Sequence, residues 1–99
     1  MPADPNALVP TVWPTSAARD AAGELVLGGV AAGALAARFG TPLYVMDESE
    51  VRAHARRVRT AFQSAAAARG TTARVYYAGK AFLSTEVVRW VTSEGLGVD

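Results

Sequence analysis

The sequence predicts an α/β fold made of parallel βαβ units, and three observations support this. The second half of the chain alternates in the order strand, helix, strand, helix, strand. The connections between these elements are only a few residues long, as in right-handed βαβ crossovers. A parallel sheet needs cover on both faces, and about three strands with two long helices cannot provide it. We therefore expect the 99 residues to be an N-terminal piece of a larger fold, holding about two of its units.

Two segments come before these units. Residues 1–23 begin with a proline-rich stretch of little periodicity, which predicts an extended arm. Residues 24–42 begin with a short strand at Glu24 to Leu27, which ends at a glycine pair where a positive φ costs little. Val30 to Arg38 has the composition of a short helix, with Gly40 as the glycine that ends it.

Residues 43–99 contain the predicted units. Leu43 to Met46 is apolar and predicts a buried strand. The helix from Glu48 to Arg69 is the clearest element, because Asp47 and Glu50 have the spacing of an N-terminal cap. One apolar stripe along this helix steps by four and three residues: Val51, Ala55, Val58, Phe62 and Ala65.

The last third of the chain completes the alternation. Arg74 to Ala78 is β-branched and aromatic and predicts a strand. Ser84 is the predicted N-cap of a second helix that continues through Val91, with Val87, Val88 and Val91 facing inward. Gly97 to Asp99 then begins another strand.

Composition excludes several classes of site. Without cysteine there is no disulfide and no thiolate ligand or nucleophile, and one histidine cannot supply a His-rich metal site, so we expect no metal. The net charge of +1 gives no electrostatic footprint for nucleic acid. The most apolar stretch, Leu25 to Ala37, contains three glycines and is too short to span about 30 Å of hydrocarbon. With no basic leader before it, we expect a cytoplasmic protein without a membrane segment.

Lys80 is the candidate functional residue. It is the single lysine beside nine arginines, and it follows the carboxyl end of a predicted strand, where the loops of βα folds collect function. A lysine amine, unlike a guanidinium, can lose its proton and attack a carbonyl to form a Schiff base. The alternative is a solvated loop lysine with no chemical role, and the residues alone leave both interpretations open.

Three segments carry a resemblance to a known family: Phe39 to Val45, Tyr77 to Phe82 and Glu94 to Asp99. Together they resemble the diaminopimelate decarboxylases, which belong to the fold-type III pyridoxal-phosphate enzymes with ornithine and arginine decarboxylases and alanine racemase. The G-T-P-L-[YF]-V and Y-A-x-K-A motifs match in order and at the family's usual separation. The resemblance covers most of residues 24–99, and the arm around Trp13 is similar to actinobacterial members.

Two positions qualify the resemblance. Most relatives have Asn after K-A, where this chain has Phe82, a residue that we associate with actinobacterial diaminopimelate decarboxylases. Alanine racemases continue the lysine motif differently, and Leu83-Ser84-Thr85 departs from their pattern. The resemblance is therefore to a decarboxylase rather than to a racemase.

The resemblance implies a fold and a set of site residues. Residues 43–99 would be the first βα units of a (β/α)8 TIM-type barrel, the alanine racemase-like N-terminal domain. Residues 24–42 would associate with a C-terminal β-domain. Lys80 would bond covalently to pyridoxal 5′-phosphate, Tyr77 and Ala78 would lie on the strand beneath the cofactor ring, and Asp99 would lie close to the cofactor.

The implied activity is the decarboxylation of meso-2,6-diaminopimelate to L-lysine and CO₂ in lysine biosynthesis, by a homodimer that takes a small amino-acid substrate. The residues that hold the phosphate, the pyridine nitrogen and the substrate would lie downstream, so 99 residues alone would be inactive. Three alternatives remain: a non-catalytic pyridoxal-phosphate-binding barrel, another amino-acid decarboxylase of the same family, and a small βα interaction module that needs no cofactor.

Overall fold

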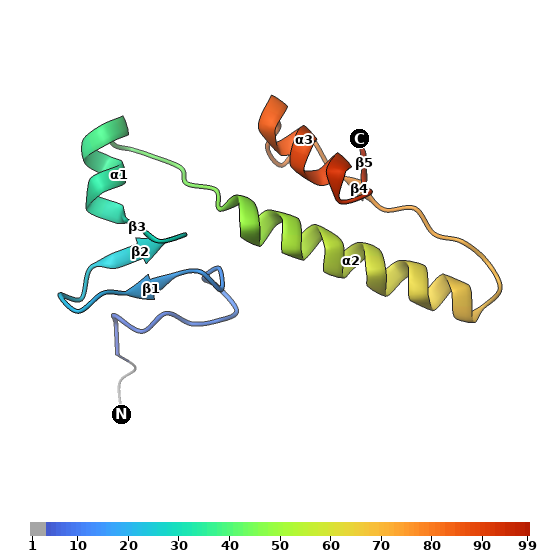
Figure 1. Ribbon diagram of the computed structural model, residues 1–99, viewed down its shortest axis with the longest axis horizontal. Coiled ribbons are helices and arrows are strands. Elements are labelled where there is room, and N and C mark those ends of the chain that lie inside the picture. The colour runs from blue at the N-terminus through green and yellow to red at the C-terminus, as the bar shows by residue number, and fades with distance from the viewer. Residues whose placement is uncertain (1–3) are drawn as a thin grey trace. The chain divides into compact units, whose positions relative to one another are not determined.

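The computed structural model describes residues 4–99, which form two compact units, Met1–Glu50 and Val51–Asp99. The unit boundary falls inside a long helix, whereas the predicted division at residues 42 and 43 concerns the whole protein and stays a prediction. The elements in chain order are β1 (Ala18–Arg19), β2 (Leu25–Leu27), β3 (Val30–Ala31), α1 (Ala32–Phe39), α2 (Glu48–Ala68), β4 (Tyr76–Tyr77), α3 (Thr85–Ser93) and β5 (Gly97–Val98) (Figure 1).

The first unit contains a three-stranded antiparallel sheet in the order β1-β2-β3. The predicted strand at β2 is confirmed, but the helix begins at Ala32 rather than at Val30. Gly28 and Gly29 have φ values of 55° and 82°, and positive φ at both positions is what a tight hairpin turn requires. The turn reverses the chain, so that Val30 pairs with Leu27 before the helix can start.

Both edges of β2 are paired inside this unit, to β1 on one side and to β3 on the other. Any strand added to this sheet from elsewhere would therefore pair with β1 or β3. The predicted association of this segment with a β-domain stays a prediction, and β2 itself has no edge left for it.

The segment between α1 and α2 corrects one expectation. Gly40 ends α1 as predicted, with φ of 81° and its N–H donating to the carbonyl of Ala36 at 2.8 Å. Leu43 to Met46, however, is not a strand, and its side chains are exposed, Tyr44 by 98%. A strand is defined by hydrogen bonds to a neighbouring strand, and the described residues supply none for this segment. Apolar composition alone was therefore a misleading signal here.

Helix α2 begins where its cap predicts. The N–H of Glu50 donates to Asp47 Oδ1 at 3.3 Å, and the hydroxyl of Ser16 donates to the other carboxylate oxygen. The hydrogen bond from Ser16, with those from the backbone of Glu50 and Ser49, lowers the pKa of the Asp47 carboxyl. The apolar stripe of α2 is covered only near the start of the helix: Ala55 is buried, whereas Phe62 is 60% exposed.

The second unit contains the predicted parallel pairing. β4 and β5 pair in parallel, with Tyr76 opposite Gly97 and Tyr77 opposite Val98. Helix α3 begins at its predicted cap, where the hydroxyl of Ser84 accepts from the N–H of Val87 at 3.2 Å. The core of this unit consists of residues from α2, α3 and the segment before β5: Ala55, Val87, Val91 and Leu96.

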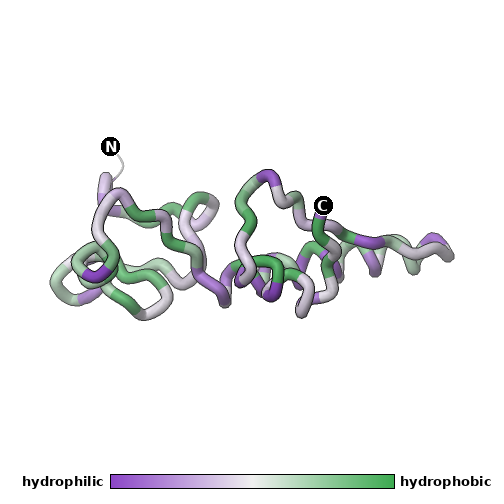
Figure 2. The backbone as a smooth tube through the Cα atoms, turned by 90° about the horizontal axis from the view of Figure 1, so that it is seen from above, coloured by the Kyte–Doolittle hydropathy of each residue, from purple (hydrophilic) through white to green (hydrophobic). Residues whose placement is uncertain are grey.

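Much apolar surface remains uncovered. The chain exposes 7374 Å², whereas two separate compact units of half its mass would together expose about 6,500 Å². Large apolar side chains that are more than half exposed include Val12, Phe39, Tyr44, Phe62, Tyr76, Phe82 and Leu83, and Figure 2 shows apolar stretches recurring along both units. The expectation of uncovered apolar faces is confirmed.

Candidate functional site

Lys80 lies in a turn directly after β4, at the carboxyl end of the strand, as the sequence predicts. The N–H of Ala81 donates to the carbonyl of Ala78 at 3.1 Å and closes this turn around Lys80. The side chains of Lys80 and Ala78 are both exposed. No ion pair involves Lys80 among residues 4–99, so within this part of the chain its amine is accessible and uncompensated.

Asp99 directly follows β5, and the parallel pairing brings it to the same edge of the sheet as the Lys80 turn. The N–H of Asp99 donates to the carbonyl of Tyr77 at 2.9 Å, and the N–H of Gly79 donates to the carbonyl of Asp99 at 2.8 Å. The contact is made by the backbone of Asp99, while its side chain is exposed. The structure thus brings together Ala78, Lys80 and Asp99, three of the residues singled out from the sequence.

Gly79 makes this approach possible, and sequence reasoning did not single it out. A Cβ at residue 79 would lie 2.7 Å from the carbonyl oxygen of Asp99, which is closer than such atoms approach in proteins. Glycine is the residue that lets two backbones come this near. The signal available in the sequence was the position of Gly79 immediately before the only lysine.

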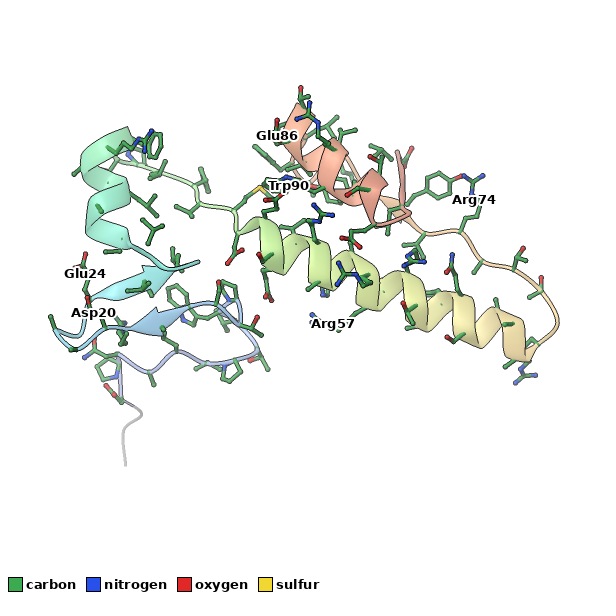
Figure 3. The ribbon with its side chains drawn as sticks, viewed as in Figure 1. Asp20, Glu24, Arg57, Arg74, Glu86 and Trp90 are labelled. Atoms are coloured by element: carbon green, nitrogen blue, oxygen red, sulfur yellow. The ribbon has the colours of Figure 1, made fainter. Side chains whose placement is uncertain are left out.

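The two faces of the sheet differ at this edge. Tyr77 and Val98 pack against the core, so alternation along the strands puts Tyr76 and Gly97 on the opposite face. There the ring of Tyr76 lies against Gly97, where an added Cβ would be 2.5 Å from the ring Cδ1. The guanidinium of Arg74, labelled in Figure 3, lies 5.6 Å from the centre of the same ring. An open hollow here is lined by Tyr76, Val98 and Asp99.

A cluster of charged side chains joins α2 to the end of α3. Arg56 forms a two-pronged contact with Glu94, from Nη2 to Oε1 at 2.8 Å and from Nε to Oε2 at 3.0 Å, and Arg52 Nε donates to Oε1 at 2.9 Å. The Glu94 side chain is only 7% exposed. Hydrogen bonds from Arg56 and then Arg52 lower its pKa from 4.5 to about 2.

Arg52 and Arg56, whose side chains are 37% and 56% exposed on α2, thus hold a buried carboxylate at the end of α3. Spacing along one helix could not reveal a partner 38 residues away. Two further findings concern residues 4–99: none of their helices is long and apolar enough to cross a membrane, and none of their His, Asp and Glu side chains form a group of three or more that could hold a metal ion.

The residues present fit a cofactor that carries an aldehyde. The Lys80 amine is exposed at the carboxyl edge of a parallel sheet, and a lysine amine can bond to a carbonyl carbon once it has lost its proton. Its neighbours in the turn are the small residues Ala78, Gly79 and Ala81. The site therefore presents an accessible amine among small residues.

The fold and site define a parallel βαβ segment that carries an exposed lysine at the carboxyl edge of its sheet. No family model matches the chain. Comparison with known proteins shows that the chain is homologous to diaminopimelate decarboxylases, mostly from actinobacteria.

Three relatives illustrate the match. The chain is 42% identical to the diaminopimelate decarboxylase of Mycobacterium tuberculosis over 92 residues, which is 93% of this chain and 19% of the relative. It is 50% identical to that of Actinosynnema pretiosum over 93 residues, 94% of this chain and 19% of the relative. With that of Bacillus subtilis it shares 44% identity over 77 residues, 78% of this chain and 17% of the relative. The chain thus spans about a fifth of the length of the curated relatives that it matches.

Proposed function

We propose that this chain is the N-terminal part of a pyridoxal-phosphate-dependent decarboxylase that converts meso-2,6-diaminopimelate to L-lysine and CO₂. The observation that carries the proposal is the Lys80 turn, an accessible lysine held at the shared carboxyl edge of two parallel strands. The homology to diaminopimelate decarboxylases supports the same assignment. With it come the proposals of a (β/α)8 barrel, a homodimer and a cytoplasmic location.

Three residues receive roles in this proposal. Lys80 would hold the cofactor through a covalent bond from Nζ to its aldehyde carbon, formed after Nζ has lost a proton and with release of the aldehyde oxygen as water. Ala78 is small and exposed on the same turn and would leave space beneath the ring. Asp99 keeps the turn in place through its backbone, with its carboxylate free at the same edge.

The net reaction breaks the bond between one α-carbon of the substrate and its carboxylate, releases CO₂ and adds a proton to that carbon. Pyridoxal phosphate, when bound, supplies an electron sink for the electron pair that the departing CO₂ leaves behind. The Lys80 amine, when it is not bonded to the cofactor, would be a nearby group that can hold and deliver a proton. Decarboxylation thus depends on Lys80 twice, for holding the cofactor and for proton transfer.

The experiment uses the full-length gene product, purified with pyridoxal phosphate, beside its Lys80→Ala variant. We expect an absorbance band near the visible in the wild type that borohydride bleaches and that the variant lacks. Because Lys80 is the only lysine between Arg74 and Arg89, its reduction onto the cofactor blocks trypsin there. Mass spectrometry should then find the peptide from Val75 to Arg89 uncut and carrying the cofactor mass.

Each alternative gives a different outcome. A band fixed on Lys80 with no release of CO₂ from any amino acid would identify a non-catalytic pyridoxal-phosphate-binding protein. Release of CO₂ from another amino acid, but not from meso-2,6-diaminopimelate, would identify another decarboxylase of the family. Absence of the band in the wild type would refute the cofactor assignment and leave a βα module whose Lys80 has no chemical role.

A further inference from the structure

The geometry points to Tyr77 as a positioning residue, whose hydroxyl fastens the loop that carries Lys80 to the core of the second unit. The inference rests on the proposed function, in which Lys80 is the reactive residue. The hydroxyl of Tyr77 donates a hydrogen bond to the backbone carbonyl of Phe82. That carbonyl lies two residues beyond Lys80, so the bond closes the far side of the loop.

Packing against the core holds the ring of Tyr77 in place, which fixes the position of its hydroxyl. Tyr77 is half-buried, packs against the core cluster and lies opposite Val98 in the sheet register. Its ring thus belongs to the covered face of the sheet, whereas its hydroxyl reaches the edge where β4 ends. A side chain anchored in a packed core loses little further freedom when its hydroxyl makes a hydrogen bond.

The near side of the loop is held separately. Gly79 N–H donates to the carbonyl of Asp99, and Ala81 N–H donates to the carbonyl of Ala78. Lys80 therefore lies in a short segment that is held by hydrogen bonds on both sides. The bond from Gly79 to Asp99 comes before it, and the bond from Tyr77 to Phe82 comes after it. Side-chain packing does little to hold the far side, because Phe82 and Leu83 are 52% and 53% exposed.

Loss of the hydroxyl should free the far side of the loop and leave the sheet intact. The amine of Lys80 would then sample more positions and would spend less time within reach of a cofactor bound at the sheet edge. The matched comparison is Tyr77→Phe against Tyr44→Phe. Both remove one tyrosine hydroxyl, but Tyr44 is 98% exposed in the first unit.

The test uses the full-length gene product with and without pyridoxal 5′-phosphate. For Tyr77→Phe we expect about fivefold weaker cofactor affinity, slower covalent capture of the cofactor by Lys80 and a shifted pH midpoint of the absorbance band. Without cofactor, the backbone amide of Ala81, which donates to the carbonyl of Ala78, should exchange with solvent several-fold faster, while urea unfolding is weakened by no more than the loss of one hydrogen bond explains. Tyr44→Phe should match the wild type in every measurement.

Three results would overturn the inference: cofactor capture and local exchange in Tyr77→Phe that equal those of the wild type, equal losses in both variants, or faster exchange throughout the protein with a larger loss of stability than one hydrogen bond explains. The last result would identify Tyr77 as a general packing residue. The amide exchange is measured without cofactor, so it tests the tie even if the wild type forms no absorbance band. A failure of the proposed function and a failure of this inference are thus distinguishable.

Discussion

Gly79→Ala should loosen the edge of the sheet where Lys80 lies. The added Cβ would lie 2.7 Å from the carbonyl oxygen of Asp99, a backbone atom held in place by the pairing of β5 with β4. Relieving this overlap means lengthening or losing the hydrogen bond of 2.8 Å from residue 79 to Asp99. Overpacking costs about 1–3 kcal/mol, part of which is the weakened or lost hydrogen bond, so local opening should become easier by about 2 kcal/mol.

Native-state amide exchange measures this free energy directly at the N–H of Asp99, which donates to the carbonyl of Tyr77. A loss of about 2 kcal/mol corresponds to about 30-fold faster exchange at that amide. The experiment is done on the full-length gene product under conditions where exchange follows the opening equilibrium. Cofactor affinity, measured on the same samples, should fall together with the protection of this amide.

Gly33→Ala is the matched control. A Cβ there would meet Glu24 Oε1 at 2.6 Å, which is an even shorter distance, but that atom is the far end of a flexible side chain, and moving it costs at most its hydrogen bond of 2.9 Å from the N–H of Gly33. Gly33 also lies inside α1, where alanine is favoured over glycine by about 1 kcal/mol. We expect stability within about 1 kcal/mol of the wild type. Equal exchange at Asp99 in Gly79→Ala and Gly33→Ala would refute the reasoning, because the close approach would then not constrain residue 79.

Two further predictions concern the second unit. Glu94 has a folded-state pKa of about 2, below its ordinary value of 4.5, so its contribution to stability is fully present above about pH 4.5 and is lost as the pH falls toward 2. Urea titrations at several pH values should show that this loss of stability in acid is smaller in Glu94→Gln than in the wild type. An equal loss in both proteins would contradict the assignment. Ser84→Ala removes the side-chain acceptor for the N–H of Val87 and should lower the free energy of urea unfolding by about 1 kcal/mol. Ser93 lies in the exposed last turn of α3, so Ser93→Ala should lower it by clearly less. Equal losses in the two variants would count against a capping role for Ser84.

The elements predicted correctly are those specified by local signals. Asp47 and Ser84 are caps whose partners lie three residues away, and Gly40 ends α1 through a bond to a residue four positions earlier. Such contacts depend on spacing along one helix, and spacing is visible in a sequence. The parallel pairing of β4 and β5 followed from the alternation of elements, which is also a property of chain order.

The errors arose where a distant partner decides the structure. Leu43 to Met46 has the composition of a strand but lacks a neighbour to pair with among the described residues, and Val30 joins a hairpin because two glycines reverse the chain before it. The pairing of the exposed Arg56 with the buried Glu94 joins helices that are far apart in sequence. Each of these depends on which segments meet in space.

The candidate site divides in the same way. Lys80 was found because a single lysine at the end of a strand is visible in the sequence. Gly79 and the hydroxyl of Tyr77 were not, because their importance comes from carbonyl oxygens, of Asp99 and Phe82, that no side-chain pattern reports. Backbone partners carry no residue identity, so only the structure reveals them.

The contact of Tyr76 with Gly97 has a consequence for how this protein can change during evolution. The ring occupies the space that any side chain at residue 97 would need, so the two positions are not free to vary independently. A larger residue at 97 is acceptable only after residue 76 has become smaller, which makes the order of substitutions matter. Residues in contact show such non-additive effects. Lineages that diverge at this sheet should therefore replace the tyrosine first and the glycine second more often than in the reverse order.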